Sequence, residues 1–248
     1  MNSRICISLP ITSGKVSNAI NIIKKALKYE PHFIELRFDY IDNLDAIKQD
    51  LLEPLLEIIE PKCLSIFTFR SFNEGGKYQI EGGKRLQILK ELISSNPNYV
   101  DIEMDTKDII LSQVINSAVN EKINLIFSHH DFEKCLSLDE SQTYINMFIN
   151  RLKDDFDLNL NHIDNSIYKI IFTAEKFIDN LIPLTLCASL KDEINIISFC
   201  MGNKGLFSRI FCTEFGSFFT YGSLEKETAP GQIKIEKIRY YHKLLLDF

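Results

Sequence analysis

The sequence lacks any long apolar run, and no stretch reaches the roughly 18 apolar residues that a membrane-spanning helix needs. It also lacks a run of lysine and arginine, and its formal net charge of −6 argues against a nucleic-acid partner. A strand-like segment at residues 5–9 follows the first residue so closely that we expect no signal peptide. These absences predict a cytoplasmic protein that binds neither nucleic acid nor a membrane.

Cysteine pairs and glycine-rich phosphate loops are absent as well. The six cysteines form no Cys-x-x-Cys pair, and no histidine cluster at metal spacing lies near them. We interpret them as reduced thiols, with disulfides as the weaker alternative. Gly202 and Gly205 alone do not make a phosphate-binding loop, and Gly75-Gly76 is typical of a turn.

The chain does contain a regular alternation of strand-like and helix-like segments. Strands are predicted near residues 4–9, 32–38, 63–69, 98–104, 123–129, 167–173, 194–200 and 217–222. Helices are predicted near residues 14–29, 43–59, 82–94, 107–120, 139–154, 174–189, 205–214 and 232–246. Eight such units in 248 residues predict one domain over residues 1–248, an α/β fold of the (β/α)8 TIM-barrel type. The polar stretch 154–166 is predicted to be a surface loop.

Charged residues recur at alternate positions late in several predicted strands. Residues 33–39 carry Glu35, Arg37 and Asp39 at this spacing, and residues 99–105 repeat the pattern. Side chains two apart share one face of a strand. The intervening residues are apolar and suit the helices outside, so the charged face is predicted to line the barrel interior.

Three further strands carry residues of the same kind: two end in Arg70 and His130, and a third carries Lys169 inside an aliphatic run. A single pair such as Glu35 and Arg37 is equally well explained as an internal salt bridge. Five strands sharing the feature favour an active site, because barrel enzymes build their sites at the carboxyl ends of the strands.

The residue types indicate chemistry next to a carbonyl group. A lysine buried among cations or apolar walls has a lowered pKa, and its neutral amine forms an imine with a ketone. A histidine then removes the neighbouring proton, tuned by a carboxylate such as Glu74 or Asp101, while arginines hold a substrate carboxylate. This reasoning leaves three alternatives open: a dehydratase, a Schiff-base aldolase, and a barrel without catalytic activity.

Several motifs together resemble the type I 3-dehydroquinate dehydratase family over almost the whole chain. The motifs are Glu35-Leu36-Arg37, Phe67-Thr68-Phe69-Arg70, Glu74-Gly75-Gly76, Asp101-Ile102-Glu103, Ser128-His129-His130-Asp131-Phe132, Met201-Gly202, Ser208-Arg209, Glu214-Phe215-Gly216-Ser217 and Ala229-Pro230-Gly231-Gln232. The resemblance implies the dehydration of 3-dehydroquinate to 3-dehydroshikimate in the shikimate pathway. It implies no metal and no cofactor, and a homodimer.

The resemblance also implies a catalytic set of Lys169, His130 and Glu74. Lys169 forms the imine, and His130 moves the proton between C2 and the departing C1 hydroxyl. Glu74 and Asp101 orient or tune that histidine. His129 is expected to point the other way along the strand, and Lys176 to face solvent. His32, His162 and His242 match no motif and are expected to be surface or packing residues.

The substrate-binding residues that the resemblance implies are Ser8, Glu35, Arg37, Arg70, Arg209, Thr228 and Gln232. Arg209 is expected to hold the carboxylate, and Glu35 and Arg70 the ring hydroxyls. A loop at residues 229–232 is expected to close over the substrate. The chain departs from the family at two positions, with Thr228 where serine is common and Tyr168 where proline often precedes the imine lysine.

Overall fold

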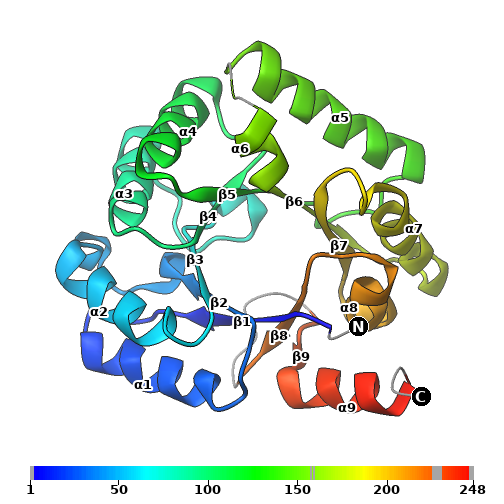
Figure 1. Ribbon diagram of the computed structural model, residues 1–248, viewed down its shortest axis with the longest axis horizontal. Helices are drawn as coiled ribbons and strands as arrows, with labels where there is room; N and C mark the ends of the chain where they lie inside the picture. The colour runs from blue at the N-terminus through cyan, green and yellow to red at the C-terminus, as the bar shows by residue number, and fades with distance from the viewer. Residues whose placement is uncertain (1–2, 157, 159, 225–230, 246–248) are drawn as a thin grey trace.

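The framework of the molecule is a sheet of parallel strands surrounded by helices (Figure 1). The computed structural model describes residues 3–156, 158, 160–224 and 231–245. The strands are β1 Ile5–Pro10, β2 Phe33–Arg37, β3 Leu64–Thr68, β4 Tyr99–Glu103, β5 Asn124–His130, β6 Ile167–Thr173, β7 Asn195–Met201, β8 Thr220–Ser223 and the short β9 Ile233–Lys234. All ladder pairs are parallel, which confirms the predicted βαβ units.

Helices follow the strands and cover the outside of the sheet (Figure 1). The α-helices are α1 Val16–Leu27, α2 Gln49–Ile59, α3 Gly82–Ser94, α4 Asp108–Glu121, α5 Leu138–Asp154, α6 Leu160–Asn165, α7 Leu181–Leu190, α8 Leu206–Phe211 and α9 Ile235–Leu245. Short 3₁₀ turns are η1 Phe38–Tyr40, η2 Leu44–Ala46, η3 Phe72–Glu74, η4 Phe177–Asn180, η5 Asn203–Gly205 and η6 Cys212–Phe215.

The strand order brings the two ends of the sheet toward each other. Neighbours run β7-β6-β5-β4-β3-β2-β1-β8-β9, so β8 returns beside β1. In the described part of the chain β7 and β8 form no ladder, but the backbone N–H of Phe218 donates to the carbonyl of Ile196 at 2.7 Å and links them. The sheet therefore curls into the predicted TIM-barrel arrangement, with its weakest seam between β7 and β8.

The barrel interior changes from apolar to charged along the strands. Its floor consists of the buried strand residues Cys6, Phe33, Ile66, Ile126, Ile167 and Ile197, while Ile171, Phe199, Met201 and Tyr221 of the same apolar cluster line the cavity. Two residues after Phe33 on the same face comes Glu35, and two after Ile167 comes Lys169. Burial of each large apolar side chain contributes roughly 1.5–3 kcal/mol to the free energy of unfolding. This contribution supports the charged layer above the floor.

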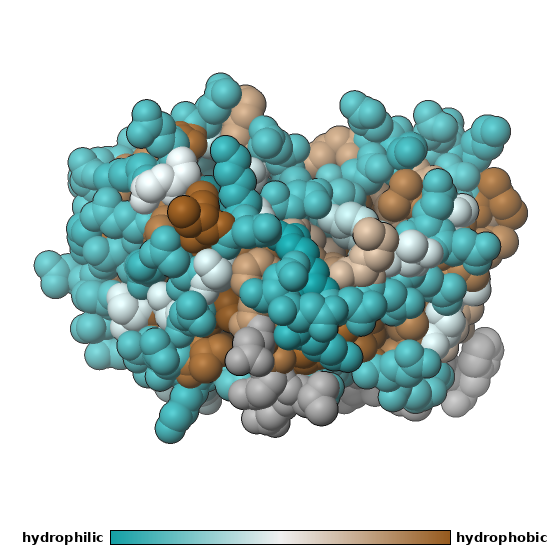
Figure 2. All heavy atoms as spheres, turned by 90° about the horizontal axis from the view of Figure 1, so that it is seen from above, coloured by the Kyte–Doolittle hydropathy of each residue, from teal (hydrophilic) through white to brown (hydrophobic). Residues whose placement is uncertain are grey.

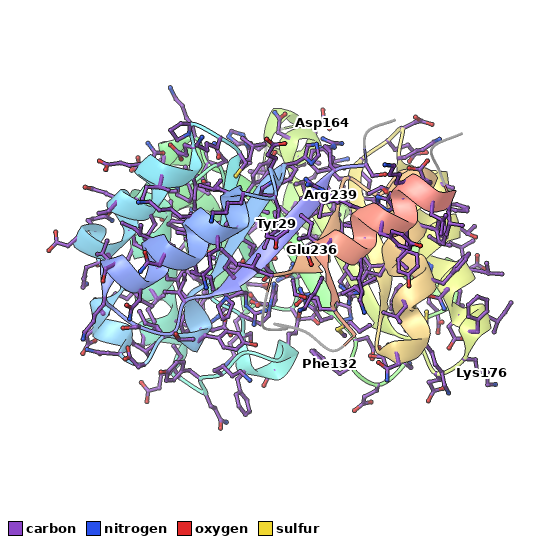
Figure 3. All side chains as sticks on the ribbon, turned by 90° about the horizontal axis from the view of Figure 1, so that it is seen from below. Tyr29, Phe132, Asp164, Lys176, Glu236 and Arg239 are labelled. Atoms are coloured by element: carbon purple, nitrogen blue, oxygen red, sulfur yellow. The ribbon has the colours of Figure 1, made fainter. Side chains whose placement is uncertain are left out.

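The segment before β6 differs from the prediction. Residues 154–166 were expected to form a loop, but α6 occupies Leu160–Asn165 within it. Ile163 and Leu158 are buried, and Asn195 donates its side-chain N–H to the carbonyl of Asp164 at 2.9 Å. Two buried apolar residues are enough to pack one helical turn against the barrel. They were not recognised in the sequence, because the residues around them are mostly polar. In Figure 3 Asp164 lies on the edge opposite Phe132, so α6 covers the amino ends of the strands.

Several predicted helices are shorter than expected, because turns or a short strand occupy residues at one of their ends. The side chain of Asn43 accepts the N–H of Asp45, which forms η2 ahead of α2. The 3₁₀ turn η4 precedes α7, and η5 and η6 flank α8. The last predicted helix begins only after β9, at Ile235.

The face of the molecule in Figure 2 is mainly hydrophilic, with hydrophobic side chains in small separate areas. Among the described residues, no helix combines the length and the apolar character needed to cross a membrane. The six cysteines are free thiols, which confirms the interpretation made from their spacing.

Candidate active site

A cavity opens at the carboxyl ends of the strands, and its empty space, together with the adjoining open solvent, is about 370 Å³. The residues that line it are Glu35, Arg37, Arg70, His130, Lys169, Ile171, Phe199, Met201, Arg209, Tyr221 and Gln232. Seven of these eleven were predicted from the sequence as catalytic or substrate-binding residues. Phe132 and Lys176, which follow β5 and β6, lie at the same edge of the molecule in Figure 3.

Lys169 projects into this cavity from the middle of β6. Its neighbours Tyr168 and Ile170 pack outward into the core between sheet and helices, which directs Lys169 inward. The side chain is 2 % exposed, and its ammonium group forms an ion pair with the carboxylate of Asp101. The same Nζ atom donates to the hydroxyl of Tyr221 at 3.4 Å and lies 5.1 Å from the centre of that ring.

His130 ends β5 and is held by Glu74 from the loop after β3. Nδ1 of His130 lies 2.7 Å from Oε2 of Glu74, and the same oxygen accepts the backbone N–H of His130 at 3.0 Å. Because Nδ1 is occupied, Nε2 is the ring nitrogen left to exchange a proton with a ligand.

Burial shifts the pKa values of this pair in opposite directions. Desolvation, followed by the positive charges of Arg70 and Lys169, lowers the pKa of His130 well below its usual range. Desolvation, followed by the carboxylate of Glu103, raises the pKa of Glu74 to about 9. The imidazole is therefore an uncharged base at neutral pH, next to a carboxyl group that shares its proton with the ring.

Two glycines fix the loop that presents Glu74. Gly75 has φ +85°, and a Cβ atom there would lie 2.8 Å from the ring of Phe132. A Cβ atom on Gly76 would lie 2.0 Å from the carbonyl oxygen of Arg70. Only glycine fits at these two positions. The motif Glu74-Gly75-Gly76 therefore allows the β3 loop to pack against the β5 loop, which brings Glu74 to His130.

Arg70 lies at the centre of a buried polar network. Its guanidinium contacts Asp101 at 2.8 Å, Glu103 at 2.8 Å and the hydroxyl of Ser128 at 2.6 Å. Burial opposes ionisation of Asp101, but Arg70 and Lys169 hold the pKa of this carboxyl well below its usual range. Asp101 therefore stays ionised and balances both cations.

A second group of polar residues lies toward the carboxyl ends of β1, β2 and β3. Glu35 accepts the hydroxyl of Ser8 at 2.5 Å and the hydroxyl of Thr68 at 2.9 Å. Arg37 donates to both carboxylate oxygens of Asp39, at 2.7 and 2.9 Å. These contacts fix Glu35 and Arg37 at the wall of the cavity, as their alternate positions on β2 predicted.

Arg209 and Gln232 complete the wall from the other side. Arg209 is 1 % exposed, and its guanidinium lies 4.4 Å from the centre of the Phe199 ring. Gln232 follows Gly231, whose φ is +69° and whose Cβ position lies 2.6 Å from the carbonyl oxygen of Gly202. Thr228, another predicted binding residue, lies outside the described residues together with Ala229 and Pro230.

The structure differs from the sequence-based expectation for Asp101. We expected this carboxylate to tune His130, but its described contacts are with Lys169, Arg70 and Ser128. The alternation along the strand predicted that Asp101 faces the barrel interior. It could not predict which side chain Asp101 contacts there. Ser8 also acts through Glu35 and is not part of the cavity wall.

Four wall residues were missed, namely Tyr221 and the apolar Ile171, Phe199 and Met201. The alternation of side chains along a strand is the pattern that could have identified them. Ile171 lies two residues after Lys169 on the same face of β6, and Met201 lies two residues after Phe199 on β7. Sequence reasoning treated apolar strand residues as core, although these four also contact the cavity.

Other residues that were expected to have no catalytic role do not line the cavity. His129 contacts Asp105 at 3.2 Å and Tyr144 at 3.2 Å, and Lys176 is exposed. The nitrogen Nδ1 of His32 accepts the backbone N–H of Ile5.

One group of metal-type ligands occurs among the described residues. Atoms of Glu74, Asp105 and His129 lie within 4.8 Å of one another. Hydrogen bonds within the protein already use these groups, since Glu74 holds His130 and Asp105 accepts from Tyr144 at 2.9 Å. Their contacts are accounted for without an ion.

Comparisons with known proteins agree with this geometry. The family model described as type I 3-dehydroquinase matches residues 5–246. A 3-dehydroquinate dehydratase of Methanococcus maripaludis is 32% identical over 241 residues, which are 96% of this chain and 99% of the relative. A crystal structure of the type I enzyme from Clostridium difficile, with covalently modified comenic acid, is similar with a TM-score of 0.80 and 26% identity, covering 98% of this chain and 92% of that chain.

The corresponding structure from Aquifex aeolicus has a TM-score of 0.74 and 27% identity, covering 99% of this chain and 100% of that chain. The matches thus extend over the whole barrel, including every strand that contributes to the cavity. The chain belongs to the type I 3-dehydroquinase family.

Proposed function

We propose that this protein is a 3-dehydroquinate dehydratase, which removes water from 3-dehydroquinate to give 3-dehydroshikimate in the shikimate pathway. One observation carries the proposal within the family: a buried lysine and an uncharged histidine share a single cavity with three arginines. An imine-forming amine, a base and anion-binding groups are what a carboxylated ketone needs in order to lose water.

The proposed reaction starts at Lys169. Its amine adds to the C3 ketone, and loss of water gives a protonated imine that withdraws electrons from C2. Nε2 of His130 takes the C2 proton, which leaves an enamine. The same histidine returns a proton to the C1 hydroxyl as the C1–O bond breaks, and water departs. Hydrolysis of the imine then releases 3-dehydroshikimate and restores the amine.

Glu74 and Asp101 have separate supporting roles in this scheme. Glu74 bonds to Nδ1 of His130 and stabilises the ring while it carries the extra proton. Asp101 stays ionised beside Lys169 and stabilises the positive charge of the imine. The carboxylate that we assigned to the histidine from the sequence is thus better assigned to the lysine.

Substrate binding is proposed to divide the cavity by charge. Arg209 holds the substrate carboxylate, because its guanidinium is buried and lies on the wall. Glu35 and Arg70 bind ring hydroxyls, and Arg70 does so while bonded to Asp101 and Glu103. Ser8 supports Glu35, and Arg37, Gln232 and Thr228 complete the binding set.

A turnover assay tests the proposed function. The protein is mixed with 3-dehydroquinate, and the conjugated enone of the product is followed by its ultraviolet absorbance. Growth of that absorbance is expected. Cleavage of an aldol substrate without it would favour a Schiff-base aldolase, and no covalent adduct after borohydride treatment would favour a barrel without catalytic activity.

We also propose a cytoplasmic homodimer with one catalytic domain over residues 1–248. Support for the dimer is an exposed apolar area on η4 and the start of α7, where Phe177 is 66% exposed, Ile178 61% and Leu181 50%. Free thiols are usual in a reducing compartment. Sedimentation of the wild type and of Ile178→Asp measures the dimer, and a monomeric wild type would contradict it.

A further inference from the structure

We propose that Tyr221 is a further catalytic residue, whose hydroxyl relays protons from the Lys169 amine to the C3 oxygen while the imine forms. This inference rests on the proposed function and adds a role that the proposed scheme leaves unfilled. The amine begins as an ammonium group paired with Asp101, so protons must leave it before and after it attacks the ketone. The oxygen on C3 must gain two protons to depart as water.

Tyr221 lies where its hydroxyl can take protons from the amine and give protons to the C3 oxygen. Its hydroxyl lies 3.4 Å from Nζ of Lys169 and accepts a hydrogen bond from it. The side chain is 5% exposed and lines the same cavity. In the described part of the chain that hydroxyl donates no hydrogen bond to another protein group, which leaves its proton available to a ligand in the cavity. Once C3 is bonded to Nζ, the C3 oxygen lies on an atom adjacent to Nζ, within reach of the hydroxyl.

The other hydrogen-bond partner of the amine is poorly suited to this task. Among the described residues, Nζ of Lys169 donates to Asp101 and to Tyr221. Arg70 and Lys169 together hold the pKa of Asp101 far below its usual range, although its burial works in the opposite direction, so this carboxylate does not accept a proton readily. A hydroxyl both accepts and donates, which is the property that a relay requires.

The tyrosine also remains uncharged throughout the relay. Burial, with the nearby carboxylate of Glu35, raises the pKa of Tyr221 well above its usual range. A free phenolate is therefore costly here, and each transfer must be concerted. As the oxygen of Tyr221 takes a proton from nitrogen, it passes its own proton to the C3 oxygen.

The proton balance closes in two transfers. In the first, the ammonium loses one proton through Tyr221, the amine lone pair forms the N–C3 bond, and the ketone oxygen becomes a hydroxyl. In the second, the nitrogen, which still carries two protons, loses one through Tyr221 to that hydroxyl. The C3–O bond then breaks, the nitrogen lone pair forms the C=N bond, and water leaves. Ammonium and ketone have become protonated imine and water, with no added oxidant or base.

The test compares Tyr221→Phe with Tyr168→Phe. Tyr168 is buried on the other face of β6, and its hydroxyl donates to the carbonyl of Ile163 at 3.3 Å, away from the cavity. Each variant is mixed rapidly with 3-dehydroquinate and quenched with borohydride at set times, and the adduct on Lys169 is counted by mass spectrometry. Thermal melting confirms that both variants fold.

For Tyr221→Phe we expect adduct formation to slow by about 10²-fold, the lower range for a lost proton-transfer group, while Tyr168→Phe matches the wild type. With substrate deuterated at C2, the isotope effect on turnover should shrink in Tyr221→Phe, because imine formation then limits the rate. An unchanged adduct rate, or an unchanged isotope effect with only a raised KM, would overturn the relay. A wild type that forms no adduct at all would instead contradict the proposed function.

Discussion

One carboxylate oxygen of Glu74 holds both the backbone N–H and the ring Nδ1 of His130, at 3.0 and 2.7 Å. This double contact fixes the orientation of the imidazole before any ligand arrives. It links the loop after β3 to the end of β5, so that two segments distant in sequence act as one unit. The consequences of this unit are testable in several ways.

Replacement of Glu74 by glutamine should lower kcat by about 10²-fold, because the amide keeps the size of the side chain but cannot share the proton of the ring. The Lys169 adduct should still form, since Glu74 does not contact the amine in the structure. Steady-state rates and borohydride trapping measure the two effects. A variant with wild-type kcat would remove Glu74 from the catalytic set.

The raised pKa of Glu74 also predicts how stability depends on pH. Its value of about 9 in the folded protein lies above the ordinary 4.5, so its stabilising contribution is present below pH 4.5 and is lost as pH rises toward 9. Between pH 7 and 9 the free energy of unfolding should therefore fall by up to about 1.4 kcal/mol per pH unit for this proton. The lowered pKa of His130 adds only a small slope of the opposite sign near pH 7, because the unfolded chain still binds part of a proton there.

Urea unfolding of the wild type and Glu74→Gln at pH 7 and pH 9 isolates this contribution, because cysteines and other groups titrate equally in both proteins. The variant should lose less stability over the interval. Equal losses in the two proteins would show that the Glu74 carboxyl is ionised at neutral pH.

Removal of the Lys169 amine should abolish the covalent adduct. Lys169→Ala is expected to give no borohydride-trapped product, because no other described lysine lines the cavity. Lys176→Ala serves as the matched control, since that lysine is exposed and its loss should leave the adduct intact. Mass spectrometry of both proteins after treatment reads the result, and an adduct that persists in Lys169→Ala would redirect the assignment.

Loss of the His130 ring should separate binding from turnover. His130→Ala is expected to accumulate the adduct while kcat falls by at least about 10²-fold, because the C2 proton has no base. His129→Ala is the neighbouring control, since His129 contacts Asp105 and Tyr144 and does not line the cavity. Comparable turnover in the two variants would exclude His130 as the proton carrier.

A change of Arg209 to lysine should raise KM more than it lowers kcat. The charge is kept, but the two-pronged hydrogen bond to a carboxylate is lost, which corresponds to about tenfold to 10²-fold in binding. Initial-rate kinetics over a range of 3-dehydroquinate concentrations give both constants. An unchanged KM would assign the carboxylate to Arg37 or Arg70 instead.

Much of this site could be predicted from the sequence, because alternation along strands determines which side chains face inward. Glu35, Arg37 and Lys169 were assigned to the interior on that basis, and they line the cavity. The barrel itself follows from eight strand–helix units. Local pattern does not determine which inward residues touch one another, because partners come from different strands.

The incorrect predictions have the same cause, because local pattern does not determine contacts between segments that are distant in sequence. Asp101 was assigned to His130, but its carboxylate contacts Lys169 and Arg70 from neighbouring parts of the barrel. Tyr221 was not singled out, because a tyrosine in a β-rich run is common and carries no functional signal of its own. Helix α6 was read as a loop, because two buried apolar residues carry little pattern in a polar segment.

The apolar floor of the barrel governs the movement of water. Phe33, Ile66, Ile126 and Ile197 are fully or almost fully buried and close the barrel beneath the lysine. Solvent cannot approach the imine from below, so the molecule that hydrolyses it must enter by the mouth that the substrate used. In the proposed binding mode the bound ring occupies that mouth, and release of product is coupled to its loosening from Arg209. Tighter ring binding would protect the imine and delay each cycle at its last step.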